Sequence, residues 1–248
     1  MMNNLANKTI GSVVAQNWKT ASVFQKHNLD FCCKGNIPIG AACEAAGLDT
    51  DEVTQEVASI LDSSEGPETD YAAWPLDQLA QHIETRHHGY VTAKMPELTT
   101  YLDKLCVVHG SRHPELFVIR ELFAQSVGEL TTHMKKEELM VFPFVKKMVQ
   151  ARRENQEITA PVYGTVQNPI AVMMHEHTDE GERFAKIAEL SNNYTTPADG
   201  CTTYRVAYNL LQEFEQDLHK HIHLENNILF PKAIGLEQEL ALPAQETA

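Results

Sequence analysis

The sequence predicts an all-α protein, in which a small N-terminal helical domain precedes an up-and-down four-helix bundle. Three observations support this fold class. Apolar residues recur with helical spacing through most of the 248 residues, and no useful stretch alternates with the period of a β-strand. The four longest helical patterns, of roughly 25 to 35 residues each, are separated by segments rich in Gly, Pro, Asn and Thr.

Residues 1–62 form the expected N-terminal domain. Gly47 is typical of a helix end, and Thr50, with two acidic residues behind it, is typical of a helix start. The segment SSEGPETD (63–70) then interrupts the helical pattern with Gly, Pro and acids, so we expect a linker at 63–74. The periodic stretches of this domain are 10–24, 39–46 and 53–61.

The expected bundle covers residues 75–235, and a C-terminal tail follows at 236–248. Four long helices joined by short connections favour the up-and-down arrangement. Their predicted ranges are 75–108, 115–149, 168–192 and 202–230.

Composition excludes several classes of function. The net charge of −14 argues against a nucleic-acid partner, which needs clustered Lys and Arg. No apolar stretch is long enough to span a membrane, and the N-terminus lacks the pattern of a secretion signal. Five unevenly spaced cysteines predict free thiols in a reducing compartment. We therefore expect a cytoplasmic monomer or homodimer without membrane or nucleic-acid partners.

Two segments of the expected bundle are near copies of each other. Residues 133–143 (HMKKEELMVFP) and 221–231 (HIHLENNILFP) both follow the pattern H-x-x-x-E-x-x-x-x-F-P. Side chains four residues apart lie on one face of a helix, so each segment can direct an imidazole and a carboxylate at one point. The two pairs are His133 with Glu137 and His221 with Glu225.

Two further histidines extend the repeat. His88 precedes His133 by 45 residues, and His177 precedes His221 by 44. The bundle therefore looks like two copies of a helix pair, in which the first helix supplies one His and the second a His and a Glu. Together the copies supply four nitrogen ligands and two carboxylates, which is enough for two metal ions.

Helical phase distinguishes inward-facing from outward-facing histidines. On the last helix, Glu225 and several apolar residues fall within about 40° of His221, whereas His219 and His223 lie near the opposite side. On the third helix, apolar residues flank His177, and His175 points away. His133 is likewise flanked by apolar residues on the second helix.

The first helix leaves a choice between neighbours. His87 is in phase with the apolar residues upstream, and His88 with those downstream. We choose His88, partly because it fits the repeat spacing. His109 is a further candidate, but a straight helix would place it roughly 30 Å from His88, so both cannot bind one site.

The duplicated pattern favours a metal site over a structural role. A single His–Glu pair in a bundle is more often a hydrogen-bonded core pair than a metal site. Six converging imidazoles and carboxylates would be costly to bury without a cation. Imidazole with carboxylate and no thiolate suits iron or manganese, and two shared carboxylates would bridge two ions.

These motifs resemble the haemerythrin-like domain of the Ric family, the "repair of iron centres" di-iron proteins. The resemblance rests on residues 133–143 and on DLHKHIHLENNILFP (217–231), and CTTY (201–204) adds to it. HNLDFCCKG (27–35) resembles the short cysteine-bearing ScdA-type domain at the start of the same proteins. The match spans nearly the whole chain in the expected order.

The resemblance implies a stress-induced cytoplasmic protein that helps to restore iron–sulfur clusters damaged by NO or peroxide. It would act by iron donation, by NO binding and reduction at the di-iron site, or by both. The implied cofactor is two non-haem iron ions bridged by carboxylates and an oxo group. The implied partners are damaged iron–sulfur proteins, with NO or O₂ as the small ligand. The family's iron ligands fall on His88, His133, Glu137, His177, His221 and Glu225.

The cysteines divide into two groups. Adjacent cysteines form a disulfide only with backbone distortion, so Cys32 and Cys33 are candidate redox or transfer thiols rather than a structural bridge. Alternatively, they fill a gap in a small core. Cys43, Cys106 and Cys201 occur singly in apolar helical settings, and we predict that they are core residues.

A sensor or storage protein of the haemerythrin type, for O₂, NO or iron, is the competing hypothesis. Such a protein would not repair clusters and would not need Cys32 and Cys33, so this pair discriminates between the two functions.

Overall fold

The computed structural model describes residues 5–62 and 69–241, and regular structure within these ranges is helical apart from an isolated bridge between Thr9 and Pro38. This confirms the predicted all-α class. The described residues form two compact units. One joins those up to Leu79 with Lys147–Thr159 and with the described part of Ile222–Ala248. The other comprises Ala80–Lys146 and Ala160–His221.

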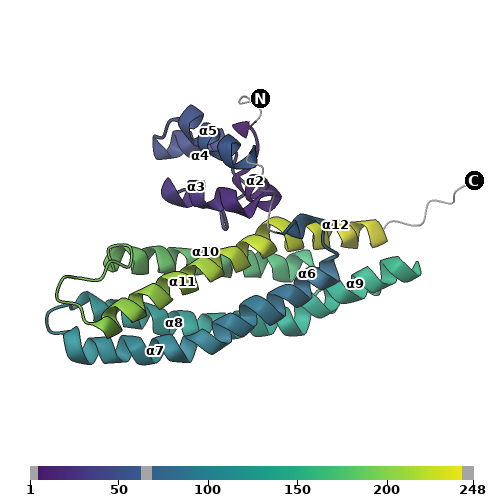
Figure 1. The fold of residues 1–248 in the computed structure, drawn as a ribbon. Coiled ribbons are helices and arrows are strands. Elements are labelled where there is room, and N and C mark those ends of the chain that lie inside the picture. The colour runs from purple at the N-terminus through teal and green to yellow at the C-terminus, as the bar shows by residue number, and fades with distance from the viewer. Residues whose placement is uncertain (1–4, 63–68, 242–248) are drawn as a thin grey trace, which may run out of the picture. The chain divides into compact units, whose positions relative to one another are not determined.

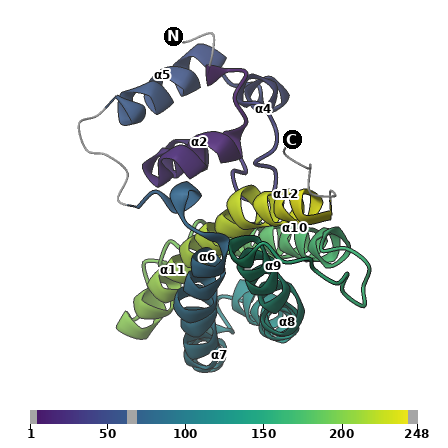
Figure 2. The ribbon, with the colours of Figure 1, turned by 90° about the vertical axis from the view of Figure 1, so that its right-hand side faces the viewer.

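The second unit contains the four-helix bundle. Helices α7 (Gly89–His109), α8 (Glu115–Lys136), α10 (Gln167–Leu190) and α11 (Thr202–Leu224) run side by side (Figure 1), and Figure 2 shows them close to end-on. Helix α8 packs against both α7 and α10.

Aromatic side chains fill the core of this bundle. The ring of Phe214 on α11 lies 5.5 Å from that of Phe123 on α8 and 5.6 Å from that of Phe184 on α10. All three are fully buried, and each contributes roughly 1.5 to 3 kcal/mol through the apolar surface that it removes from water. This core fixes the spacing of the helices that carry the two copies of the H-x-x-x-E pattern.

Three π-helical segments interrupt the long helices. They are η3 (Ile83–His88) between α6 (Leu76–His82) and α7, η4 (Glu137–Val141) before α9 (Phe142–Glu154), and η5 (Glu225–Leu229) before α12 (Phe230–Ala241). In η4 the N–H of Phe142 donates to the carbonyl of Glu137, five residues back, and in η5 Phe230 donates to Glu225 in the same way.

The repeated F-P explains the position of two of these segments. Pro143 and Pro231 lack an N–H and cannot make the usual bond to the carbonyl four residues back, which favours a widened turn just before them. The H-x-x-x-E-x-x-x-x-F-P pattern thus specifies a π-helical turn that begins at its own glutamate. Such turns are frequent at functional sites.

The first unit contains the N-terminal helices. They are α2 (Ile10–Gln16), η1 (Trp18–Thr20), α3 (Ala21–Lys26), α4 (Ile39–Ala46) and α5 (Thr50–Leu61), and the short 3-10 turn η2 (Tyr71–Ala73) comes later in the chain. Helix α4 ends at Gly47, whose φ of +67° is the left-handed conformation that glycine adopts without strain. Helix α5 begins at Thr50, as predicted, and the side chain of Asp49 caps it.

Two glycines allow the N-terminal helices of this unit to pack against η5. A Cβ atom at Gly11 would lie 2.2 Å from Oδ1 of Asn227, and one at Gly35 would lie 2.4 Å from the same atom. Asn227 also donates hydrogen bonds from Nδ2 to the carbonyls of Phe31 (3.3 Å) and Cys32 (3.2 Å). The loop that carries the adjacent cysteines is therefore attached directly to the π-helical segment.

The observed helices follow the predicted ones closely, and the last extends further. Most of the expected linker, residues 63–68, lies outside the described residues, and the division of the chain at 63–74 stays a prediction. Helix α12 continues to Ala241, into the segment expected as a tail, whose last residues also lie outside the described ranges. The observed helical runs are 76–109, 115–154, 167–190 and 202–241.

Candidate metal centre

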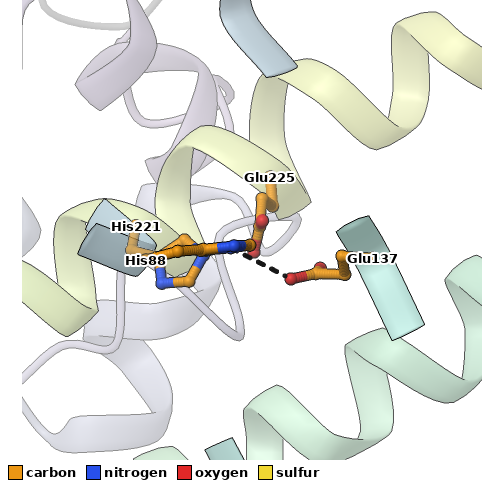
Figure 3. Close-up of side chains that lie close together, drawn as sticks. All are labelled: His88, Glu137, His221 and Glu225. Atoms are coloured by element: carbon orange, nitrogen blue, oxygen red, sulfur yellow. Dashed lines mark hydrogen bonds and ion pairs between the residues drawn. The ribbon is translucent and has the colours of Figure 1, made fainter. Parts of the chain in front are cut away.

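The structure brings the six predicted ligands together as two donor groups. One consists of His88, Glu137, His221 and Glu225, and the other of His133, Glu137, His177 and Glu225. Within each group the candidate ligand atoms lie within 4.8 Å of one another, and every member is buried. Figure 3 shows the two imidazoles and the two carboxylates of the first group pointing toward each other.

Each group is built around a pair of imidazoles. The Nε2 atoms of His88 and His221 lie 3.2 Å apart, and those of His133 and His177 lie 2.9 Å apart. Two nitrogens bound to one transition-metal ion at about 2.1 Å and at a right angle lie about 3 Å apart. The separation of each pair is therefore that of two ligands on one ion.

Glu137 and Glu225 belong to both groups. The Oε2 atom of Glu137 lies 3.4 Å from Nε2 of His88 and 3.3 Å from Nε2 of His133. Both carboxylates are the first residues of π-helical segments, η4 and η5. Each of these two carboxylates therefore lies close to donors of both groups.

Carboxylates hold the other ring nitrogen of one histidine in each group. Nδ1 of His88 lies 3.0 Å from Oε1 of Glu138, and Nδ1 of His133 lies 2.8 Å from Oε2 of Glu176. A ring that donates from Nδ1 keeps its lone pair on Nε2, which faces the cluster. These two contacts set the tautomer and the orientation of the rings.

Basic neighbours keep these two carboxylates charged. The hydrogen bonds from His133 and Lys136 lower the pKa of Glu176 to about 2, against the opposing effect of burial. Burial also opposes the lowering of the pKa of Glu138, but the hydrogen bonds from Lys135 and His88 outweigh it. Both groups are therefore strong acceptors for an imidazole N–H at neutral pH.

Sequence reasoning did not single out Glu138 or Glu176. Each is the immediate chain neighbour of a predicted ligand, Glu138 of Glu137 and Glu176 of His177. A residue next to a ligand on a helix points about 100° away from it, so helical phase does not group either residue with its neighbouring ligand. No sequence signal marks them, because their contacts with the histidines of neighbouring helices depend on how the helices pack.

The choice between His87 and His88 has a structural explanation. His88 lies in the first donor group, whereas Nδ1 of His87 lies 3.1 Å from Oδ2 of Asp217 and its ring stacks on that of His221. Segment η3 inserts one extra residue in a turn at this point, so the buried face upstream is in phase with His87 and the face downstream with His88. Both histidines are buried for this reason.

The remaining histidines stand apart from the donor groups. His175 is exposed, as phase predicted. His223 is buried within the first unit, where its ring packs against those of Trp18 and Phe31. His109 lies at the far end of α7, where it contacts Cys201 and the ring of His113 and no residue of the donor groups.

The adjacent cysteines form a third group of possible ligands with Asp30. Both are free thiols, with their sulfur atoms 3.7 Å apart, and both backbone N–H groups donate to Oδ1 of Asp30. The hydrogen bond to Cys33, together with burial, raises the pKa of the Cys32 thiol well above its ordinary value. Cys32 therefore carries its proton at neutral pH.

Of the three cysteines predicted to be core residues, Cys43 and Cys106 are buried and Cys201 is exposed. The prediction for Cys201 was wrong because this residue does not lie on an apolar helix face. It directly precedes Thr202, where α11 begins, and its side chain is exposed there.

The donor set fits iron. Six buried groups supply four imidazoles and two carboxylates without a thiolate, a combination suited to iron and manganese rather than to a cysteine-rich structural zinc site. Two carboxylates buried among imidazoles also favour a cation between them, because an uncompensated buried charge is costly.

Comparison with known families agrees with this geometry. Residues 79–233 match the family model described as "Hemerythrin HHE cation binding domain", and residues 6–61 match ScdA_N, described as a domain of unknown function. The chain belongs to the haemerythrin-type cation-binding family and also carries an ScdA_N domain.

Curated relatives cover nearly the whole chain. The iron-sulfur cluster repair protein YtfE of Cronobacter sakazakii is 33% identical over 220 residues, which are 89% of this chain and 93% of the relative. The probable iron-sulfur cluster repair protein of Haemophilus influenzae is 32% identical over 86% of this chain and 90% of its own. YtfE of Escherichia coli O81 is 31% identical over 93% of this chain and 98% of its own. The resemblance to the Ric family is thereby confirmed.

No helix among the described residues is both long enough and apolar enough to cross a membrane.

Proposed function

We propose that this protein holds two iron ions on the six buried residues and repairs iron–sulfur clusters damaged by nitrosative or oxidative stress. The observation that carries the proposal is that Glu137 and Glu225 each belong to both donor groups. A mononuclear site needs no shared ligand, whereas two neighbouring ions can share carboxylates that offer one oxygen to each. The relatives named as iron–sulfur cluster repair proteins support the biological role.

The chain's own residues prepare the site for metal. His88 and His133 hold their protons on Nδ1, against Glu138 and Glu176, and so present Nε2 lone pairs to the ions. Glu137 and Glu225 supply the negative charge. The exposed fraction of each of the six residues is 4% or less, which keeps bulk water from the donors and restricts access to small molecules.

Iron bound here would supply redox chemistry and a binding position for NO or O₂. Iron donation to a damaged cluster and the reduction of NO are both compatible with the site. We keep them as linked proposals, with repair as the biological outcome.

Cys32 and Cys33 are the proposed redox or transfer thiols. The carbonyl of Cys32 accepts hydrogen bonds from Asn226 (3.3 Å) and Asn227 (3.2 Å), the two residues that follow Glu225 along the chain. Within the first unit, the thiol loop is thus bound to the same π-helical segment that begins with a proposed bridging ligand. A cytoplasmic location, where thiols stay reduced, accords with their free state.

Reactivation of a nitrosylated iron–sulfur enzyme tests the proposal. The iron-loaded chain should restore activity, and His177→Leu should abolish the restoration because it removes one ligand. His175→Leu is the matched control, since this side chain lies on the same helix and is 78% exposed. Equal repair by the two variants would contradict the assignment of the site.

The same assay addresses the sensor or storage hypothesis. A Cys32→Ser/Cys33→Ser double variant should keep its iron and lose most of the repair activity. If repair is undiminished while iron is bound normally, the thiols take no part in it. If the wild-type chain binds iron and NO but repairs nothing, the sensor or storage function replaces the repair function.

A further inference from the structure

His109 and Cys201 form a close pair at the end of the bundle that lies opposite the metal centre. Nε2 of His109 lies 3.2 Å from Sγ of Cys201. The 21 residues of α7 separate His109 from the metal-site end of this helix, which corresponds to roughly 30 Å. The pair is therefore remote from the proposed iron ligands, and neither the metal site nor the adjacent cysteines account for it.

The contacts of His109 indicate that this imidazole acts on the thiol of Cys201. Its side chain is only 3% exposed, and Nδ1 has no hydrogen-bond partner among the described residues. One edge of the ring packs against Tyr204, at 5.3 Å between ring centroids. The ring of His113 lies 6.4 Å away, and the hydrogen-bond partner of the buried His109 imidazole is the exposed Cys201.

Cys201 also occupies the N-terminal cap of α11. Its carbonyl accepts the first helical hydrogen bond, from the N–H of Arg205. Sγ takes the place of the usual capping oxygen, because the N–H groups of Tyr204 and Thr203 interact with it. A helix start stabilises negative charge, so this position favours the thiolate.

The contacts of Cys201 with His109 and with the N–H groups of α11 all lower the pKa of its thiol. The hydrogen bond from His109, followed by that from the N–H of Tyr204, lowers the pKa of Cys201 to about 7, although slight desolvation of the exposed thiol opposes the change. Cys106, one turn before His109 on α7, provides the contrast. It is buried, its thiol donates to the carbonyl of Leu116, and burial raises its pKa.

We propose that Cys201 is a modification site, at which a thiolate activated by His109 exchanges with low-molecular-weight disulfides such as oxidised glutathione. Sγ attacks one sulfur of the reagent, a new S–S bond forms to Cys201, and the reagent's own S–S bond breaks. The thiol proton passes through Nε2 of His109 to the departing thiolate. Cys201 is oxidised to a mixed disulfide, and the other half of the reagent leaves as a reduced thiol.

Other titratable groups surround the pair, and their effect on the pH dependence of Cys201 has to be distinguished from that of His109. His113 contacts Glu115 (3.0 Å) and Asp199 (2.9 Å), and Asp199 also pairs with Arg112. The hydrogen bond to Asp199 raises the pKa of His113 despite some burial. The groups to consider are His109 and Cys106 on α7, Arg112 and His113 in the connection, Glu115 on α8, Asp199 before α11, and Tyr204 on α11.

The test is the pH dependence of S-glutathionylation in the full-length, iron-loaded chain. Tryptic digestion separates Cys201 from Cys106 and from the Cys32–Cys33 pair, because Lys or Arg residues lie between them. We expect Cys201 to form the mixed disulfide with a rate whose midpoint lies near pH 7, while Cys106 stays unmodified. A midpoint above about pH 8, the range of an ordinary thiol, or no reaction at Cys201, would overturn the proposal.

Two variants identify the activating group. His109→Asn should raise the midpoint of Cys201 toward the ordinary thiol range and slow the reaction at pH 7 by about threefold, since the smaller thiolate fraction is partly offset by greater nucleophilicity. His113→Asn, which leaves the contact between His109 and the thiol intact, should leave the midpoint unchanged. An equal shift in both variants would contradict the role of His109. If His109→Asn does not fold, the wild-type midpoint alone decides.

Discussion

The buried carboxylate of Glu215 allows a quantitative test of the bundle core. Glu215 lies on α11 next to Phe214 and is 7% exposed. Burial raises its pKa from an ordinary value near 4.5 to about 7. The folded state therefore binds a proton that the unfolded state releases between these two pH values.

The sign and size of the effect follow from linkage. A raised pKa in the folded state gives stability that is fully present below about pH 4.5 and is lost as the pH rises to about 7. The loss is about 1.4 kcal/mol per pH unit, or about 3 kcal/mol over the whole interval. Glu215→Gln replaces the carboxylate with a neutral group of the same shape and should remove this loss.

Urea unfolding at pH 5 and pH 8, on samples with equal metal content, measures the difference. The free energy of unfolding of Glu215→Gln relative to wild type should be about 2 to 3 kcal/mol more favourable at pH 8 than at pH 5. Glu213→Gln, at an exposed position on the same helix, is the control and should change stability by less than about 0.5 kcal/mol at either pH. A pH-independent difference for Glu215→Gln would refute the argument.

Three further predictions concern the site and its support. Glu176→Gln should weaken iron binding by roughly 10- to 100-fold in a metal-competition titration because it replaces the charged carboxylate that orients His133 with a neutral amide, and unchanged affinity would contradict that role. Gly35→Ala should lower the free energy of unfolding by about 1 to 3 kcal/mol, because its Cβ would lie 2.4 Å from Oδ1 of Asn227. Gly128→Ala, where a Cβ meets nothing within 4 Å, should instead raise it by up to about 1 kcal/mol. If both alanine variants behave alike in urea unfolding, the close approach at Gly35 is not what limits stability.

Most of the bundle could be predicted from sequence because the signal is periodic. Apolar spacing gave the long helices, and the duplicated H-x-x-x-E gave residues that the structure gathers into two groups. The π-helical turns could not be found by counting at a constant angle, and η3 therefore left His87 and His88 equally in phase with different parts of one helix. The F-P dipeptides marked the other two turns, but their effect on the hydrogen bonding became evident only in the structure.

Contacts between side chains that are far apart along the chain could not be predicted from the sequence. Glu176 reaches His133 from another helix, and His109 meets Cys201 across 92 residues. Neither pair has a characteristic spacing, because their register depends on how the helices pack. Cys201 was assigned to the core for the same reason, since its surroundings were judged from chain neighbours rather than from the neighbouring helix.

Iron content after anaerobic reconstitution tests the central claim most directly. If Glu137 and Glu225 bridge two ions, elemental analysis of the reconstituted wild-type chain should give about two irons per chain. Glu137→Leu should reduce the occupancy of both positions together, because it removes a ligand from both donor groups. Fewer than about one iron per wild-type chain, or the loss of only a single iron in Glu137→Leu, would contradict a di-iron site built on shared carboxylates.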